Sequence, residues 1–237
     1  MNTNKIILII PAYNESLNIV KTIKEIEKYN KSQKEKIDYI IINDGSKDNT
    51  KEILENNKFN HINLIHNLGI GGAVQTGYKY ALDNNYDIAI QFDGDGQHDV
   101  NYVDALVKEI NKGNNLVIGS RFIEEKSKFK STKTRRMGIK LLSRTIKLCT
   151  GKKIYDTTSG FRAADRKVIE KFSKDYPTEY PEPVSNVELI KKGYKISEVP
   201  VEMKERENGI SSIKAWKAIY YMVNVILSII ITSIRRN

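Results

Sequence analysis

Short runs rich in Ile and Val recur through the first half of the chain, and segments with helical spacing separate them. In the first such segment, Ile19, Ile23 and Ile26 lie three or four residues apart, as on one face of a helix. Alternation of strand and helix over about 120 residues is typical of an α/β fold with a doubly wound, mostly parallel sheet and helices on both faces. The predicted strands are 5–10, 37–43, 62–66, 88–92, 116–119 and 195–204, and the predicted helices are 16–29, 47–57, 72–83 and 99–111.

Size and charge narrow the class of protein. The 237 residues suit one domain, or one domain with an appendage. Lys and Arg exceed Asp and Glu by 39 to 29, and the net charge of +10 predicts anionic partners: phosphates, nucleic acid or an acidic membrane surface. The single Cys149 excludes an internal disulfide. The apolar stretch from Ile6 to Ile10 is too short for a signal peptide, so we expect the domain to stay in the cytoplasm.

Polar or glycine-rich turns follow four of the predicted strands. These turns are Pro11–Glu15, Asn43–Ser46, Asn67–Gly72 and Asp93–Asp95. The carboxyl ends of parallel strands meet at one edge of a sheet, and open α/β sheets bind their ligands there. We therefore expect the four turns to form one continuous rim around a binding site.

The turn after the fourth strand carries two carboxylates, Asp93 and Asp95, separated by a glycine. On a flexible turn both can point to one position, which suits a hard divalent cation that also binds phosphate oxygens. An ordinary Asp-Gly turn is the alternative interpretation. A calcium loop of the EF-hand type is excluded, because His98 stands where that loop needs Gly and Asp104 where it needs Glu. For His98 a place among the metal ligands is one alternative, but a lone His beside a turn is more often a surface or hydrogen-bonding residue.

The glycines of the third turn match no complete phosphate-binding motif. Gly72 and Gly77 have the spacing of a phosphate-binding loop, but Tyr78 replaces the lysine. The stretch from Gly69 to Val74 lacks the third glycine of a dinucleotide fingerprint. Two roles stay open for these glycines: a turn with close helix packing, or direct contact with a phosphate.

Seven segments, taken in order, carry a family resemblance. They are Pro11–Glu15, Asn43–Asp48, Asn67–Gly69, Asp93–His98, Gly119–Phe122, Thr158–Arg162 and Arg206–Ser212. In this order and spacing the chain resembles the family-2 glycosyltransferases of the GT-A fold. It is most similar to the polyprenyl-phosphate sugar transferases and to enzymes of capsule or cell-wall polysaccharide synthesis. The resemblance implies an inverting, metal-dependent transfer of a sugar from a nucleoside diphosphate to polyprenyl phosphate or to a growing glycan.

The resemblance also implies roles for individual residues. The positions that match nucleotide-sugar-binding residues are Pro11, Tyr13, Glu15, Asp44, Gly71, Asp93 and Arg206. The positions that match ligands of Mg²⁺ or Mn²⁺ are Asp93, Asp95 and Gln97. Such a cation would offset the negative charge that grows on the departing diphosphate. The residues expected to act in catalysis are Asp95, Arg121, Asp156 and Glu182.

The need for a catalytic base depends on the acceptor. Transfer to a hydroxyl requires a carboxylate near the acceptor proton, and the candidates are Asp156, Glu179 and Glu182. A lipid phosphate needs no base, because its oxygen is already an anion at neutral pH. The basic stretch with Arg135, Arg136, Lys140 and Arg144 would then dock that phosphate. No candidate matches a base motif cleanly, which favours the lipid phosphate.

The C-terminal segment from Ala218 to Ile234 is almost entirely apolar over 17 residues. A helix of that length is about 25 Å long, which is short for a hydrocarbon core of roughly 30 Å. We expect residues 1–210 to form the GT-A domain and residues 211–237 a helix that lies in the membrane interface or on a membrane subunit. A spanning helix and a buried core or dimer helix are the alternatives. The protein is accordingly expected at the cytoplasmic face of the cell membrane, peripheral or weakly anchored.

Two other functions compete with the glycosyltransferase. A sugar nucleotidyltransferase has a related sheet but needs a glycine-rich, basic loop near the first strand, and Pro11–Glu15 does not supply one. A nucleic-acid-binding protein is suggested only by net charge, and the chain contains no aromatic–basic motif of the usual RNA modules. Nucleic acid is therefore not expected as a partner, whereas a homo-oligomer stays possible.

Overall fold

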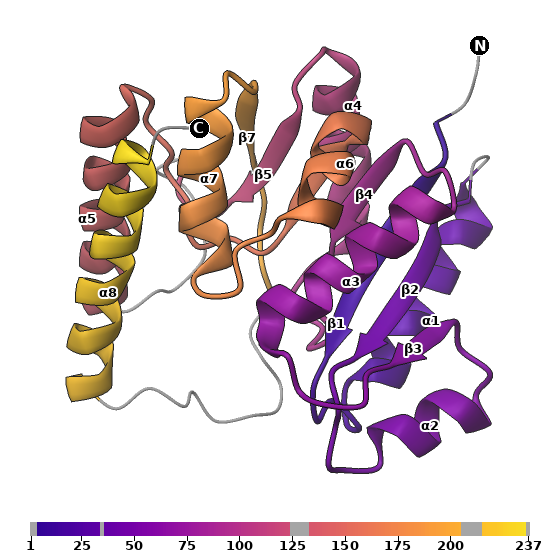
Figure 1. The fold of residues 1–237 in the computed structure, drawn as a ribbon. Coiled ribbons are helices and arrows are strands. Elements are labelled where there is room, and N and C mark those ends of the chain that lie inside the picture. The colour runs from indigo at the N-terminus through magenta and orange to yellow at the C-terminus, as the bar shows by residue number, and fades with distance from the viewer. Residues whose placement is uncertain (1–3, 34–35, 124–132, 205–214, 236–237) are drawn as a thin grey trace.

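The computed structural model describes residues 4–33, 36–123, 133–204 and 215–235 (Figure 1). Seven strands form one sheet in these ranges, in the order β3-β2-β1-β4-β6-β5-β7. The strands are β1 (Ile6–Ala12), β2 (Asp38–Asn43), β3 (His61–Asn63), β4 (Ile88–Gln91), β5 (Leu116–Ser120), β6 (Arg162–Asp165) and β7 (Ile196–Pro200). Strand β6 runs antiparallel to β4 and β5, and the other pairs are parallel. The predicted α/β fold with a doubly wound, mostly parallel sheet is confirmed.

Helices cover both faces of the sheet (Figure 1). They are α1 (Ile19–Ser32), α2 (Thr50–Asn56), α3 (Gly69–Asp83), α4 (Val103–Asn111), α5 (Lys133–Thr150), α6 (Arg166–Lys174), α7 (Pro181–Lys191) and α8 (Ala215–Ile234), with a short 3₁₀ turn at Val100–Tyr102. Successive residues of a strand point to opposite faces. Leu8 and Ile10 of β1 therefore join the core beneath α1 and α4, while Ile7 and Ile9 join the core beneath α3 and α6.

The order of the strands reverses at β1. The chain passes from β1 through β2 to β3 on one side, and β4 then pairs with the other side of β1. Ligand sites of open α/β sheets lie at such a reversal, outside the carboxyl ends of the strands. The turns after β1, β2 and β4 consequently surround one position.

Three elements between residues 153 and 195 are absent from the sequence prediction: β6, α6 and α7. Strand β6 is four residues long and carries Ala163 and Ala164 in place of an Ile or Val run. Helix α6 begins at a local signal, since the Asp165 carboxylate accepts a hydrogen bond from the Val168 N–H at 2.9 Å. Helix α7 has Pro181 in its first turn, a position that proline favours.

Helices α5 and α8 lie side by side at one end of the molecule, next to α7 (Figure 1). Val225 and Ile229 of α8 are fully buried and belong to the same core as β1 and α3. In the described ranges, no helix is both long enough and apolar enough to cross a membrane. The boundary predicted at residue 210 falls within 205–214, outside the described residues, so the division into two units stays a prediction.

Candidate active site

A cavity of about 490 Å³ opens at the carboxyl ends of β1, β2 and β4, where the strand order reverses. It gathers most of the residues predicted to bind the donor or the metal, namely Pro11, Tyr13, Glu15, Asp44, Asp93 and Asp95, together with Glu182, which is predicted to act in catalysis. The remaining walls come from Asn67, Gly69, Ile70, Thr158 and Gly160, among others. We call this the acidic cavity, because carboxylates supply its charged side chains.

The turns after β1 and β2 hold each other in place. The Asn14 N–H donates to Ser46 Oγ at 3.0 Å, and the Lys47 N–H donates back to Asn14 Oδ1 at 2.8 Å. The Ser16 N–H donates to the Asp48 carboxylate at 3.2 Å. These bonds place Tyr13 and Glu15 at the rim of the acidic cavity. The Tyr13 ring stays exposed.

Asp44 is fixed at the cavity wall by its own neighbours. Its Oδ1 accepts a hydrogen bond from the Leu68 N–H at 2.7 Å, and Asn67 Nδ2 donates to its carbonyl at 3.1 Å. These two bonds join the turn after β2 to the start of α3. A preorganised carboxylate of this kind can accept hydrogen bonds from a nucleoside base or a ribose hydroxyl.

The loop that carries Asp93 and Asp95 is folded by short-range hydrogen bonds. Asp95 Oδ1 accepts from the Gln97 N–H at 3.0 Å, and Gly96 adopts a positive φ of 77° that glycine tolerates best. Thr22 Oγ1 of α1 donates to the Gly94 carbonyl at 3.1 Å. The loop is thus held from its own backbone and from α1, and both carboxylates line the acidic cavity.

The carboxylates of the acidic cavity suit a cation that also binds the substrate. Among the residues that the structure describes, no three His, Cys, Asp or Glu side chains gather as a protein-only metal site. Two carboxylates together with diphosphate oxygens are, however, the usual ligands of Mg²⁺ in nucleotide enzymes. Gln97 does not line the acidic cavity; its Nε2 lies 3.4 Å from the Lys204 carbonyl. Asp93 and Asp95 are therefore the residues that fit Mg²⁺ or Mn²⁺.

Arg121 and Asp156 form a buried ion pair. Arg121 Nε donates to Asp156 Oδ2 at 2.7 Å and Nη2 donates to Oδ1 at 2.8 Å, the bidentate geometry that guanidinium and carboxylate prefer. Asp156 is 0% exposed, and it does not line the acidic cavity. The structure thus does not bring Asp156 to the place predicted for a base; both its oxygens orient Arg121. Arg121 Nη2 also donates to Thr158 Oγ1 at 3.2 Å, and Thr158 does line the cavity.

Glu182, at the start of α7, is the base candidate that the structure does place at the acidic cavity. Burial raises the pKa of Glu182, and the nearby guanidinium of Arg162 offsets part of that rise. Arg162 is fully buried; its Nη1 donates to Ser185 Oγ at 2.9 Å and its Nη2 donates to the Ser159 carbonyl at 3.0 Å. Arg162 belongs to one of the seven family segments, Thr158–Arg162, but the sequence alone predicts no role for it.

Two glycines differ from the sequence expectation. A Cβ on Gly71 would lie 2.6 Å from the Pro177 carbonyl oxygen and 2.7 Å from Thr178 Cα, so Gly71 permits close packing of α3 and does not line the cavity. Of the two roles left open for these glycines, the structure gives Gly71 the packing one. Gly160, which sequence reasoning missed, lines the cavity, and a Cβ there would lie 3.3 Å from Asp93 Oδ1.

A second cavity of about 880 Å³ lies beside α5. Its charged residues are all cationic: Arg121, Arg136, Lys140, Arg144 and Lys153. Phe122, Ile123, Ile139, Ser143 and Tyr155 complete its lining, and Lys153 Nζ lies 4.0 Å from the centre of the Tyr155 ring. We call this the basic cavity. It contains three of the four basic residues predicted to dock a phosphate; the side chain of Arg135 and all of Arg206 lie outside the described residues.

The fold and the site define a glycosyltransferase of the GT-A type, and comparison with known proteins gives the family. The family model described as "Glycosyl transferase family 2" matches residues 7–173, so the chain belongs to that family. UDP-N-acetylglucosamine–dolichyl-phosphate N-acetylglucosaminyltransferase of Methanococcus voltae is 34% identical, over 83% of this chain and 84% of that protein. Polyprenol monophosphomannose synthase of Mycolicibacterium smegmatis is 26% identical, over 88% and 81%.

A solved structure shares the fold. Glucosyl-3-phosphoglycerate synthase from Mycobacterium tuberculosis, crystallised with Mn²⁺, UDP-glucose and phosphoglyceric acid, superposes with a TM-score of 0.71. The match covers 99% of this chain and 81% of that one at 17% sequence identity. The GT-A fold predicted from the sequence is therefore confirmed, and the family match confirms the assignment as a glycosyltransferase.

Proposed function

We propose that this glycosyltransferase moves a sugar from a nucleoside diphosphate to polyprenyl phosphate, with inversion and with Mg²⁺ or Mn²⁺. The observation that carries the proposal is the junction of the two cavities at Arg121. This residue lines the basic cavity and hydrogen-bonds Thr158, which lines the acidic cavity. A donor in one cavity and an anionic acceptor in the other would meet at this guanidinium.

The donor belongs in the acidic cavity. All five of its proposed ligands line this cavity: Tyr13, Glu15 and Asp44 would hold the nucleoside, and Asp93 and Asp95 would hold the cation. When bound, the cation would neutralise the charge that develops on the leaving diphosphate. Arg206 is proposed as a further phosphate contact, by its match to the family motif. The relatives named above carry a UDP-sugar or a mannose in their names, so the choice of donor is left to experiment.

The acceptor phosphate belongs in the basic cavity. Its four surface-facing cations, Arg136, Lys140, Arg144 and Lys153, surround a space beside Arg121. A phosphate monoester bound there needs no deprotonation, so its oxygen attacks the anomeric carbon directly as the diphosphate leaves. The names of these two relatives include dolichyl phosphate and polyprenol, lipids of the class proposed here.

A second acceptor, the hydroxyl of a growing glycan, is favoured by one specific observation. Glu182 lines the acidic cavity, and burial raises its pKa, which suits a general base that must take a proton near neutral pH. Glu179 does not line that cavity. With a glycan acceptor, Glu182 is therefore the base to test.

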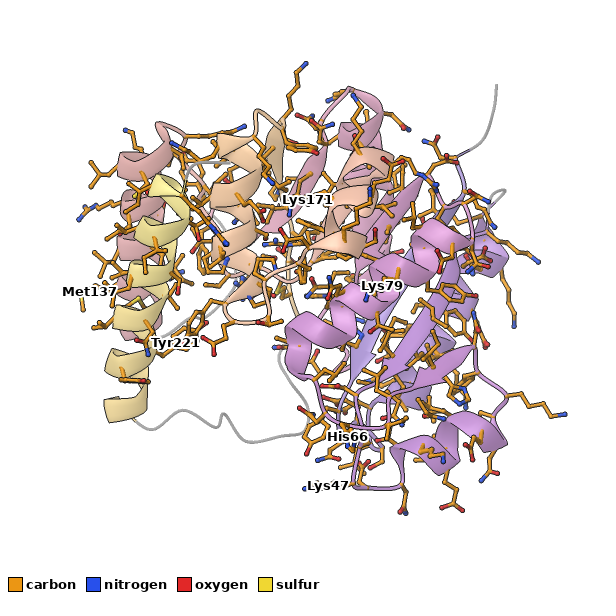
Figure 2. The ribbon with its side chains drawn as sticks, in the orientation of Figure 1. Lys47, His66, Lys79, Met137, Lys171 and Tyr221 are labelled. Atoms are coloured by element: carbon orange, nitrogen blue, oxygen red, sulfur yellow. The ribbon has the colours of Figure 1, made fainter. Side chains whose placement is uncertain are left out.

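The lipid acceptor implies contact with a membrane, and the end of the molecule formed by α5 and α8 fits that contact. Val223, Leu227, Ile230, Ile231 and Ile234 are exposed and recur at helical spacing, so they form one stripe of α8. Met137 of α5 is 70% exposed and points away from the sheet (Figure 2). Cationic Lys140 and Arg144 stand on the same helix, as expected for a surface that meets anionic lipid. We propose peripheral attachment at the cytoplasmic face; a membrane subunit or a second copy of the chain are the other possible occupants.

The test is transfer of labelled sugar from a panel of UDP-, GDP- and dTDP-sugars to short polyprenyl phosphate, with Mg²⁺ or Mn²⁺ present. We expect label in the organic phase with one donor, and none when EDTA is added. Release of nucleoside diphosphate without lipid label would move the acceptor to a glycan. Formation of a nucleotide sugar from sugar phosphate and nucleoside triphosphate would instead support the nucleotidyltransferase. Steep salt-dependent binding of nucleic acid with no transfer would contradict both enzymes.

A further inference from the structure

His98 is buried directly behind the metal-binding loop. It is 2% exposed, its ring stacks on Phe161 with centroids 4.8 Å apart, and the edge of Phe92 meets it at 5.4 Å. Phe92 and Phe161 also pack against each other at 5.7 Å. The two aromatic rings therefore fix the plane of the imidazole.

Both nitrogens of this imidazole face Asp93. Nδ1 accepts a hydrogen bond from the Asp93 N–H at 2.9 Å. A nitrogen that accepts carries no proton, so in the neutral ring the proton is on Nε2. Nε2 lies 3.4 Å from Asp93 Oδ2, so the nitrogen that carries the proton is close to that carboxylate. One side chain thus contacts both the backbone and the carboxylate of the same residue.

Gly160 also limits the space around the Asp93 carboxylate. The backbone of Gly160 approaches so closely that a Cβ there would lie 3.3 Å from Asp93 Oδ1 and 3.4 Å from Oδ2. The carboxylate is thus close to both the imidazole and this glycine, and it lines the acidic cavity. His98 does not line the cavity, so it is not itself placed to ligate a cation there.

We propose that His98 is a positioning residue that holds the Asp93 carboxylate in the orientation needed to bind the divalent cation. The inference rests on the proposed function, because it concerns the cation in the acidic cavity. The physical reason is that a ligand whose orientation is preset loses less entropy on binding. Groups that hold ligand side chains in this way typically contribute about 10–100-fold to metal affinity.

The test measures Mn²⁺ affinity directly, by electron paramagnetic resonance of free Mn²⁺ during titration in the presence of UDP or GDP. Three variants separate the two contacts of the imidazole. His98→Asn keeps an acceptor near the position of Nδ1, His98→Gln keeps a donor near the position of Nε2, and His98→Phe keeps neither. We expect about 10–100-fold weaker Mn²⁺ binding for His98→Phe and His98→Asn, and partial recovery for His98→Gln.

Tyr29→Phe is the matched control. Tyr29 is also buried, and its hydroxyl donates to Asp104 Oδ1 at 2.6 Å, away from the acidic cavity and the metal-binding loop. This variant should lose melting temperature while its Mn²⁺ affinity stays at the wild-type value. If His98→Phe does not fold, the Asn and Gln variants decide the question between them.

Two outcomes contradict the proposal, and they differ. Wild-type Mn²⁺ affinity in the His98→Asn variant, with only a lowered melting temperature, would reduce His98 to a structural residue while leaving the proposed function intact. Failure of the wild-type protein to bind Mn²⁺ with either nucleotide would remove the proposed cation site, and the role of His98 with it.

Discussion

The acidic and the basic cavity share Arg121 as a neighbour, yet they are built in opposite ways. The acidic cavity is made of strand-end turns that hydrogen-bond one another, as between Asn14 and Ser46 or Asp44 and Leu68. The basic cavity takes its cations from one face of α5, where Arg136, Lys140 and Arg144 are exposed. The turns of the first are fixed by hydrogen bonds, whereas the second presents exposed cationic side chains along a helix. This difference suits a specific nucleotide donor and a flexible lipid acceptor.

The largest expected effect is at the acidic cavity. Asp95→Asn removes one negative charge from the proposed cation site while keeping the shape of the side chain. We expect turnover to fall by roughly a thousandfold, because stabilisation of the leaving diphosphate is lost. Initial rates with saturating donor measure the loss, and thermal melting verifies the fold. Near-normal turnover by a well-folded variant would contradict the role of Asp95 as a cation ligand.

The next effect concerns the residue that joins the cavities. Asp156→Ala leaves the buried Arg121 guanidinium without its bidentate partner, and removing one member of a buried pair typically costs about 3–5 kcal/mol of unfolding free energy. Urea denaturation measures this cost. Asp156→Asn, which keeps the size of the side chain, is the companion variant. A fully stable Asp156→Asn protein without turnover would instead assign Asp156 to catalysis.

Substitutions in the basic cavity should change the KM for the acceptor and leave the KM for the donor unchanged. Lys140→Ala and Arg144→Ala each remove a charge that would contact the acceptor phosphate, which corresponds to about a tenfold rise in KM for polyprenyl phosphate. The KM for the nucleotide sugar should not change. Lys51→Ala, on the surface of α2, is the control for general loss of positive charge. Equal effects on both KM values would contradict the proposal that donor and acceptor bind in different cavities.

Substitutions in the exposed apolar stripe of α8 should reduce membrane binding more than they reduce the catalytic rate. Leu227→Asp with Ile231→Asp places two charges on one face of α8, and we expect loss of binding to vesicles that contain anionic phospholipid. Ile65→Asp is the control, because Ile65 is 91% exposed and its neighbour His66 lies far from Met137 (Figure 2). Sedimentation with vesicles measures binding. A change from dimer to monomer, with vesicle binding retained, would show that the stripe faces a second copy.

The smallest effect is on stability and depends on pH. Burial raises the pKa of Glu182 above its ordinary value of 4.5, so the folded protein keeps this proton to a higher pH than the unfolded chain does. The wild type therefore loses stability as pH rises from about 4.5 through the raised pKa, and Glu182→Gln does not. Urea midpoints of the two proteins should agree near pH 4 and favour the variant near pH 7. Agreement at both pH values would contradict the raised pKa.

The two cavities also differ in how well the sequence predicts them. Residues of the acidic cavity follow strands whose apolar runs are visible, so Asp44, Asp93 and Asp95 can be placed together from topology alone. The sequence cannot show which partner a carboxylate has. Asp156 is a candidate base by sequence. In the structure it lies buried against Arg121, because the turn before β6 brings the two residues together. Strand β6 was missed because its two alanines carry no Ile or Val signal.

The roles of two glycines are likewise not predictable from the sequence. Gly71 and Gly160 both sit in recognisable motifs, but only Gly160 faces the acidic cavity. The role of Gly71 depends on its approach to Pro177, more than a hundred residues further along the chain. Contacts between segments so distant in sequence leave no local pattern.

The central claim is that the acceptor is an anion held beside Arg121 and requires no base. The most direct measurement compares polyprenyl phosphate with the corresponding polyprenol as acceptors, using the same sugar nucleotide, the wild-type protein and the Glu182→Gln variant. We predict transfer to the phosphate by both proteins and transfer to the alcohol by neither. Transfer to the alcohol by the wild type, lost in Glu182→Gln, would contradict the claim and assign Glu182 as the catalytic base.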